Sequence, residues 1–117
     1  WLSPGTHVNA AGSNSLIRRE LGEDVVRLCS PIVVDSVQTA LGEAGDLLPL
    51  LEKGRLHARR LVELGDVISG RQTGRSAPDQ ITLFESQGMA VQDLAVAAEI
   101  ELLARERGLG IELPFGG

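Results

Sequence analysis

Two short polar segments of the chain combine small residues with side chains that can hold an organic ligand. Residues 11–14 read Ala-Gly-Ser-Asn after an apolar segment at 7–11, and residues 85–88 read Glu-Ser-Gln-Gly after an apolar segment at 81–84. Small residues let a ligand approach the backbone, and polar groups at a helix start can bind anionic or amide groups. A strand-to-helix turn with a capping side chain explains residues 11–14 equally well, because such caps are common.

Other kinds of site are not indicated by the sequence. His7 and His57 lie far apart without accompanying ligands, so no metal site is expected. The sequence has no nucleophile elbow and neither of the common glycine-rich phosphate-binding motifs. The single cysteine, Cys29, cannot form an internal disulfide, which favours a cytoplasmic location and a buried structural thiol over a reactive one.

Length and composition narrow the function further. A chain of 117 residues suits one small domain and is short for a two-lobed cofactor enzyme. A net charge of -5 without a basic run, and only 3% aromatic residues, argue against nucleic acid as a partner. No apolar run approaches the roughly 18 residues of a membrane span, and no signal peptide is indicated, so no membrane partner is expected.

Strand-like and helix-like patterns alternate along the chain. We predict strands at 7–11, 31–35 and 81–84, helical segments at 16–29 with a break at Gly22, at 37–44 and at 61–70, and a long helix at 89–107 capped by Gly108. Because Pro49 limits helix formation, residues 46–51 are expected to cover the sheet edge. Residues 71–79 are expected to form a surface loop, and residues 111–115 a last extended segment.

This alternation predicts an α/β fold with parallel strands joined by right-handed crossovers. In such sheets ligands bind beyond the carboxyl ends of the strands, where the two polar segments would meet. The strand at 31–35 would also deliver Asp35 to the entrance of the next helix. The residues alone therefore predict half of a ligand-binding α/β fold.

Six blocks in order resemble the ornithine cyclodeaminase and mu-crystallin family over nearly all of residues 3–115: PGTHVNAAGSNSLIRREL, IVVDS, ALGEAGDLL, ELGDVISGR, ITLFESQGMAVQDLAVA and RERGLGIELPF. The resemblance implies the C-terminal portion of an NAD(P)-dependent enzyme that has a Rossmann domain and a dimerising substrate domain. Residues 1–88 would form the second half of the Rossmann-like, doubly wound parallel sheet. Residues 89–117 would form a helix and a strand that return toward the substrate and dimerisation domain, and a homodimer is expected.

The same resemblance assigns roles to individual residues. Contacts to the nicotinamide end of NAD or NADP are implied for Ala11, Gly12, Ser13, Asn14, Arg18 and Ser86. Gln87 and Gly88 would belong to the pocket of a small amino or imino acid substrate. The phosphate-binding loop, the ribose-binding acid and the catalytic lysine and arginines would lie in a portion of the family protein that precedes these residues, so the 117-residue chain is expected to be inactive alone.

Asn14 departs from the cyclodeaminase pattern. Cyclodeaminases carry an aspartate at this position, which serves as an acid and base, whereas an amide cannot carry a proton at accessible pH. Hydride transfer needs only orientation from the protein, so reduction of a cyclic imine or imino acid, such as a pyrroline carboxylate, is the expected activity, with Asn14 at the reacting carbon. The alternatives are a cyclodeaminase, an alanine dehydrogenase-type enzyme, or a non-catalytic dimerisation or binding protein of the crystallin type.

Overall fold

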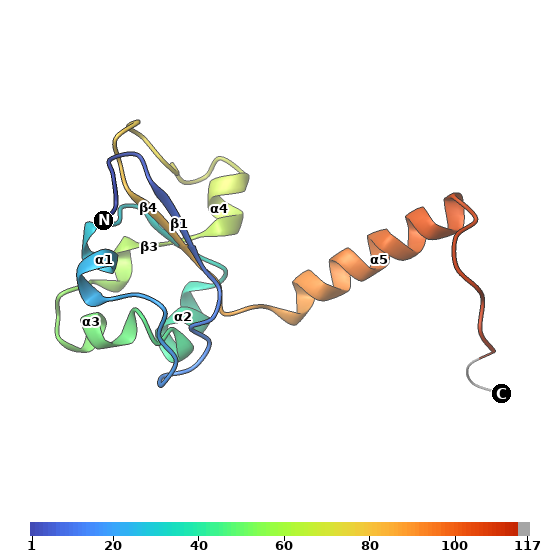
Figure 1. Cartoon of the computed structure of the whole chain (residues 1–117), viewed down its shortest axis with the longest axis horizontal. Coiled ribbons are helices and arrows are strands. Elements are labelled where there is room, and N and C mark those ends of the chain that lie inside the picture. Colours follow the sequence, from blue (N-terminus) through green and yellow to red (C-terminus); the bar gives the residue numbers. More distant parts are fainter. Residues whose placement is uncertain (115–117) are drawn as a thin grey trace.

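The computed structural model describes residues 1–114 and has a parallel sheet at its centre (Figure 1). The strands are β1 (His7–Ala10), β2 (Ile32–Val34), β3 (Leu61–Glu63) and β4 (Thr82–Glu85). Their order across the sheet is β1-β4-β2-β3, and all three neighbouring pairs are parallel. The predicted α/β class is therefore confirmed, and the carboxyl ends of all four strands lie along one edge.

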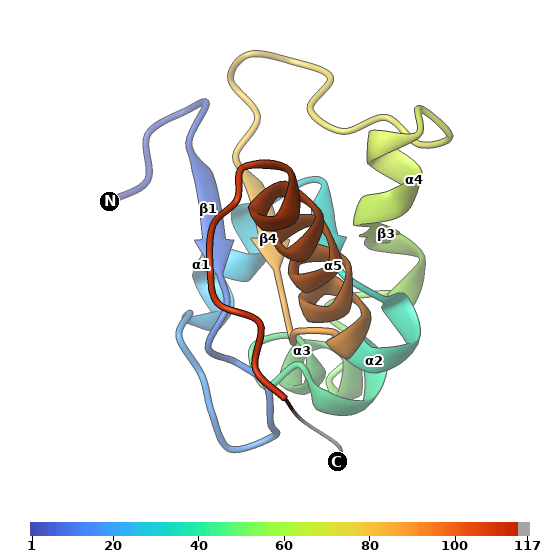
Figure 2. The same ribbon diagram turned by 90° about the vertical axis from the view of Figure 1, so that its right-hand side faces the viewer.

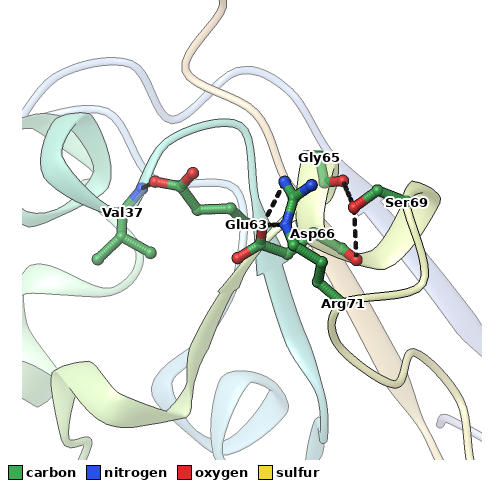
Figure 3. Close-up of polar contacts among 6 residues, drawn as sticks. All are labelled: Val37, Glu63, Gly65, Asp66, Ser69 and Arg71. Carbon is green, nitrogen blue, oxygen red and sulfur yellow. Dashed lines mark hydrogen bonds and ion pairs between the residues drawn. The ribbon is translucent and has the colours of Figure 1, made fainter.

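Five α-helices follow or connect these strands within residues 1–114. They are α1 (Glu23–Leu28), α2 (Val37–Glu43), α3 (Leu48–Glu52), α4 (Leu64–Ile68) and α5 (Ala90–Glu106), and a single further turn spans Ala58–Arg60. The start of α2 is capped twice, because Ser36 Oγ accepts from the Thr39 backbone N–H and Glu63 Oε1 accepts from the Val37 backbone N–H at 3.1 Å (Figure 3). Strand β3 thereby fixes the turn that joins β2 to α2.

The hydrophobic core lies on one face of the sheet, beneath α1, α2 and α3. Its buried members are Ala10, Val26, Cys29, Ile32, Val34, Ala40, Ala44, Leu47, Leu50, Leu56, Leu61 and Leu83. Cys29 is completely buried, its Sγ donates to the Val25 carbonyl at 3.2 Å, and burial raises the pKa of the thiol. These observations agree with the structural thiol expected from the sequence.

The opposite face of the sheet is less covered. Val33 of β2 and Phe84 of β4 line an open apolar hollow of about 510 Å³, which Leu64 and Val67 of α4 border on one side. This face does not carry the core because side chains alternate between the two faces along each strand, and the helices α1 to α3 lie on the other one. The hollow therefore lies away from the polar segments at the carboxyl edge.

Three sequence-based predictions of secondary structure between residues 16 and 70 are wrong in part. Residues 61–63 form strand β3 because Leu61 pairs with Ile32 of β2, so sheet pairing overrides the helical spacing of the apolar residues. Residues 16–22 are not helical, although their apolar residues have helical spacing. Helix α1 begins only after Gly22, which is its N-cap. Residues 48–52 form the short helix α3, since Pro49 lies in its first turn, where no intrahelical donor is needed.

Helix α5 extends away from the sheet (Figures 1 and 2). Gly108 follows it with a φ of 63°, as the predicted C-cap requires, and residues 71–79 form the expected loop without helix or strand. Residues 111–114 are not a strand, because no neighbouring strand lies there to pair with them, and Phe115 falls outside the described residues. Across residues 1–114, no helix combines the length and apolarity that a membrane crossing requires.

Candidate functional site

The two polar segments meet at the carboxyl edge of the sheet. The Ser86 backbone N–H donates to the Ala10 carbonyl at 2.9 Å, so the chain leaves β4 directly beside the point where it leaves β1. Strand β2 lies on the other side of β4, and Asp35 follows its last residue, Val34. The structure thus brings together the segments 11–14 and 86–88, as the α/β prediction requires.

The loop after β1 presents an amide and open backbone. The side chain of Asn14 is exposed, and its Oδ1 lies 3.5 Å from Nη1 of the exposed Arg18. Ala11 and Gly12 are exposed as well, and the Gly12 backbone N–H donates to Glu20 Oε2 at 2.6 Å. Because α1 begins at Glu23 with Gly22 as its N-cap, the alternative that Asn14 caps the following helix is wrong.

Ser13 faces the interior and anchors this loop. Its side chain is completely buried, and its Oγ accepts from the Asp46 backbone N–H at 2.9 Å. Asp46 Oδ1 in turn accepts from the backbone N–H groups of Glu20 and Leu21 at 2.9 and 3.1 Å. The hydroxyl of Ser13 is therefore occupied inside the fold, where the whole residue is buried and anchors the loop.

Asp35 connects the end of β2 to the segment after β4. Its Oδ2 accepts from Ser86 Oγ at 2.5 Å and from the Gly88 backbone N–H at 3.1 Å, and its Oδ1 accepts from Gln92 Nε2 of α5 at 2.9 Å. The carboxyl group is nearly buried, and both of its oxygens accept hydrogen bonds. One side chain therefore fixes both Ser86 and the start of α5.

A second carboxyl group, that of Glu85, lies buried beside the first loop. Burial, and then the nearby charge of Asp46, raise the pKa of Glu85 to about 8, although hydrogen bonding from Ser13 opposes the shift. Gln87 Nε2 lies 3.4 Å from Glu85 Oε1, whereas Glu85 Oε2 and Gln87 Oε1 are buried without a partner in the described part of the chain. At neutral pH this group is a neutral acid beneath the loop.

The polar groups at this edge suit the nicotinamide end of a dinucleotide. Ser86 and Asn14 offer neutral hydrogen-bonding groups, and a Cβ atom placed on Gly88 would meet open space, so a flat amide-bearing ring can approach. The sequence contains neither of the common glycine-rich phosphate-binding motifs. Residues 1–114 hold no group of three or more His, Cys, Asp or Glu side chains suited to a metal ion.

Sequence reasoning found the exposed groups of this edge and missed the side chains that support them. Asp35 was expected at a helix entrance, but its link to Ser86 joins residues 51 positions apart and has no local signal. Glu85 and Asp46 were not singled out, although an acidic residue at the end of an apolar strand could have drawn attention to Glu85. The implied ligand contacts all stay predictions: Ala11, Gly12, Ser13, Asn14, Arg18, Ser86, Gln87 and Gly88.

The sequence and fold of this chain are similar to those of known proteins. The model of the ornithine cyclodeaminase/mu-crystallin family matches residues 1–107. The chain is 38% identical over 115 residues to delta(1)-pyrroline-2-carboxylate reductase of Bacillus cereus, covering 97% of this chain and 35% of the relative. It is 40% identical over 97 residues to ketimine reductase mu-crystallin of Mus musculus, covering 83% of this chain and 28% of the relative.

A solved structure supports the same relationship. It is delta(1)-pyrroline-2-carboxylate reductase of Thermococcus litoralis in complex with NADH and L-proline, with a TM-score of 0.86 and 34% identity. The match covers 97% of this chain and 35% of that chain. The chain thus spans about a third of the length of the relatives it matches.

Proposed function

Because the chain belongs to the ornithine cyclodeaminase/mu-crystallin family, we propose that its protein is an NAD(H)-dependent reductase of cyclic imines or imino acids of the pyrroline-carboxylate class. The observation that carries the proposal is the neutral polar edge formed by residues 11–14 and 86–88. The similarity of the chain to pyrroline-2-carboxylate reductases, one of which is solved with NADH and L-proline, supports the substrate class. Hydride transfer would use such an edge for orientation, not for proton transfer.

The residues of this chain would orient the reacting partners. Bound NADH would supply the hydride. Ser86 would hold the amide group of the nicotinamide, and exposed Asn14 would lie at the reacting carbon and hydrogen bond without taking up a proton. Gln87 and Gly88 would line the substrate pocket, while the buried Ser13 holds the loop in place.

A substrate panel tests the proposal. Full-length protein here means the natural gene product that contains this sequence. It is mixed with the cyclic imine pyrroline-2-carboxylate and either NADH or NADPH, and oxidation of the cofactor is followed by absorbance. We expect oxidation with NADH that depends on the imine. L-ornithine and L-alanine with NAD serve as parallel arms for cyclodeaminase and alanine dehydrogenase activity.

The arms separate the alternatives. Ammonia release from ornithine would replace the proposal by a cyclodeaminase, and reduction of NAD by alanine would replace it by an amino acid dehydrogenase. No turnover in any arm, with a folded protein, would favour a non-catalytic binding protein. The NADPH arm tests whether the protein also uses NADP, the other cofactor that the resemblance implies. Sedimentation of the full-length protein tests the expected homodimer.

A further inference from the structure

Ser86 has a hydroxyl group whose hydrogen-bonding capacity is largely assigned by its neighbours. A hydroxyl offers one donor hydrogen and two acceptor lone pairs. Its hydrogen is directed to Asp35 Oδ2, and the Gly88 backbone N–H approaches Ser86 Oγ at 3.2 Å. One acceptor position therefore stays available, and Ser86 can only accept a hydrogen bond from a ligand.

Asp35 is itself held firmly in the fold. It lies directly after β2, which pairs with β4 on one side and β3 on the other. The next residue, Ser36, caps α2, and Glu63 of β3 holds the Val37 backbone N–H (Figure 3). A carboxylate fixed from both sides can impose an orientation on the more exposed hydroxyl of Ser86.

We infer that Asp35 is a positioning residue that sets Ser86 as a hydrogen-bond acceptor, and that this polarity selects a carboxamide over a ligand without an N–H donor. The inference rests on the proposed function, because it takes the nicotinamide carboxamide as the group that donates to Ser86. A charged acceptor holds a hydroxyl about twice as strongly as a neutral one, so the carboxylate is suited to this role. Gln92 contacts the other oxygen, Oδ1, and anchors α5 without contacting Ser86 in the described residues.

The test compares two reduced dinucleotides on the full-length protein. NADH carries the carboxamide, and its 3-acetylpyridine analogue carries a methyl ketone that keeps the carbonyl oxygen but lacks the N–H donor. Dissociation constants are measured by calorimetric titration for the wild type and for Asp35→Ala, Ser86→Ala and the double variant. Gln92→Ala is the matched control, because it removes a different partner of the same carboxylate.

We expect the wild type to bind NADH about tenfold more tightly than the analogue, as one hydrogen bond allows. Asp35→Ala and Ser86→Ala should each bring this ratio close to one, and the double variant should add no further loss, because both substitutions remove the same interaction. Gln92→Ala should leave the ratio unchanged. If Asp35→Ala does not fold, Asp35→Asn tests the same point and should lower the ratio, since a neutral group holds the hydroxyl less firmly.

Three results would overturn the inference. An Asp35 variant that weakens both dinucleotides equally would make Asp35 a purely structural residue, as would additive effects of the two substitutions. A wild type that binds NADH without preferring it to the analogue would show that Ser86 does not accept from the carboxamide. A wild type that binds neither dinucleotide would instead refute the proposed function, and the inference would fall with it.

Discussion

Asn14 is the residue at which the proposed reaction is most directly tested. Its side chain is exposed and is free of a capping role, so its removal should not weaken a helix. In the full-length protein, Asn14→Ala should lower kcat by about 10 to 100-fold if one orienting hydrogen bond of about 1.5 to 3 kcal/mol is lost. The pH profile of kcat should keep its shape, because an amide does not titrate.

Steady-state kinetics and thermal melting of the same variant decide the role of Asn14. Asn14→Asp is the companion variant, because it restores the carboxylate that cyclodeaminases carry and should introduce a pH dependence. Unchanged turnover in Asn14→Ala would remove this residue from the reacting site. An altered pH profile in that variant would mean that another group carries a proton there.

Glu85 predicts a pH dependence of stability. Its pKa is raised from 4.5 to about 8, so between these values the folded chain holds a proton that the unfolded chain has lost. Stability should therefore fall as pH rises through this window, by at most about 1.4 kcal/mol per pH unit for one group. Glu85→Gln keeps the shape and removes the proton equilibrium, so it should flatten the dependence.

The measurement for Glu85 is urea unfolding of the wild type and of Glu85→Gln at about pH 5 and at about pH 8. These two values span most of the range between the unfolded and the folded pKa of Glu85. The free energy of unfolding should differ little between the two proteins at the lower pH and favour the variant at the higher one. Parallel pH curves for the two proteins would show that Glu85 does not hold its proton in the folded state.

At this scale the sequence predicts exposed groups better than buried ones. Asn14 and Ser86 follow apolar segments, and a polar residue after a strand is a local pattern. Ser13 looked like their equal, yet it is buried, because its contact with Asp46 joins residues 33 positions apart. Such distant partners determine which residue of a polar cluster is buried. The sequence of the cluster itself does not reveal these partners.

At the scale of elements, the loop after β1 depends on a close backbone contact with the turn between α2 and α3. A Cβ atom on the buried Gly45 would lie 2.5 Å from the Ser15 carbonyl oxygen and would also collide with the Arg18 carbonyl. Backbone atoms cannot move aside as a flexible side chain can. We therefore expect Gly45→Ala to destabilise the fold by about 1 to 3 kcal/mol and to loosen residues 11–18.

A matched glycine lies three residues earlier. Gly42 is in α2, and a Cβ atom there meets nothing within 4 Å, so Gly42→Ala should be neutral or stabilise by about 0.5 to 1 kcal/mol. Urea unfolding compares the two variants, and limited proteolysis reports on the loop. Equal stabilities for the two alanine variants would contradict the contact. In the full-length protein, Gly45→Ala should also raise the KM for NADH.

The sequence predicts a strand well where a local apolar segment indicates it. It predicts a strand poorly where pairing with a neighbouring strand determines the structure. Residues 32–34 and 82–85 fall within or beside the predicted strands, because buried parallel strands need apolar residues. Residues 7–10 also fall within a predicted strand, but β1 is not the buried strand expected, because it lies at the sheet edge with His7 and Asn9 exposed. Strand β3 has only three residues, and its Leu61 also fits a helical repeat with the apolar residues of α4. Pairing with β2 decides between the two, and no local pattern reports it.

At the scale of the whole molecule, the chain would supply only one part of the proposed dinucleotide site. Much of the binding free energy of a dinucleotide comes from its pyrophosphate at a glycine-rich helix start, and the sequence has no such motif. The chain of residues 1–117 should therefore bind NADH far more weakly than the full-length protein. Calorimetric titration compares the two directly, and micromolar affinity of the 117-residue chain would contradict this prediction.

Helix α5 predicts how the chain associates. It extends from the sheet (Figures 1 and 2). Large apolar residues along it are exposed: Val91, Leu94, Val96, Ile100 and Leu102. A solvated helix of 17 residues is only marginally stable alone, and exposed apolar area of this extent favours a partner. We therefore expect the 117-residue chain to self-associate through α5.

Light scattering of the wild type and of Leu94→Glu with Ile100→Glu measures this association. The double variant places charges among the exposed apolar residues, so it should shift the chain toward the monomer and lower its helix content in circular dichroism. Glu99→Ala is the matched control, because it changes an exposed acidic residue of the same helix and leaves the apolar side chains in place. A monomeric wild type with a fully formed α5 would show that the helix is stable in water without a partner, and self-association would then be ruled out.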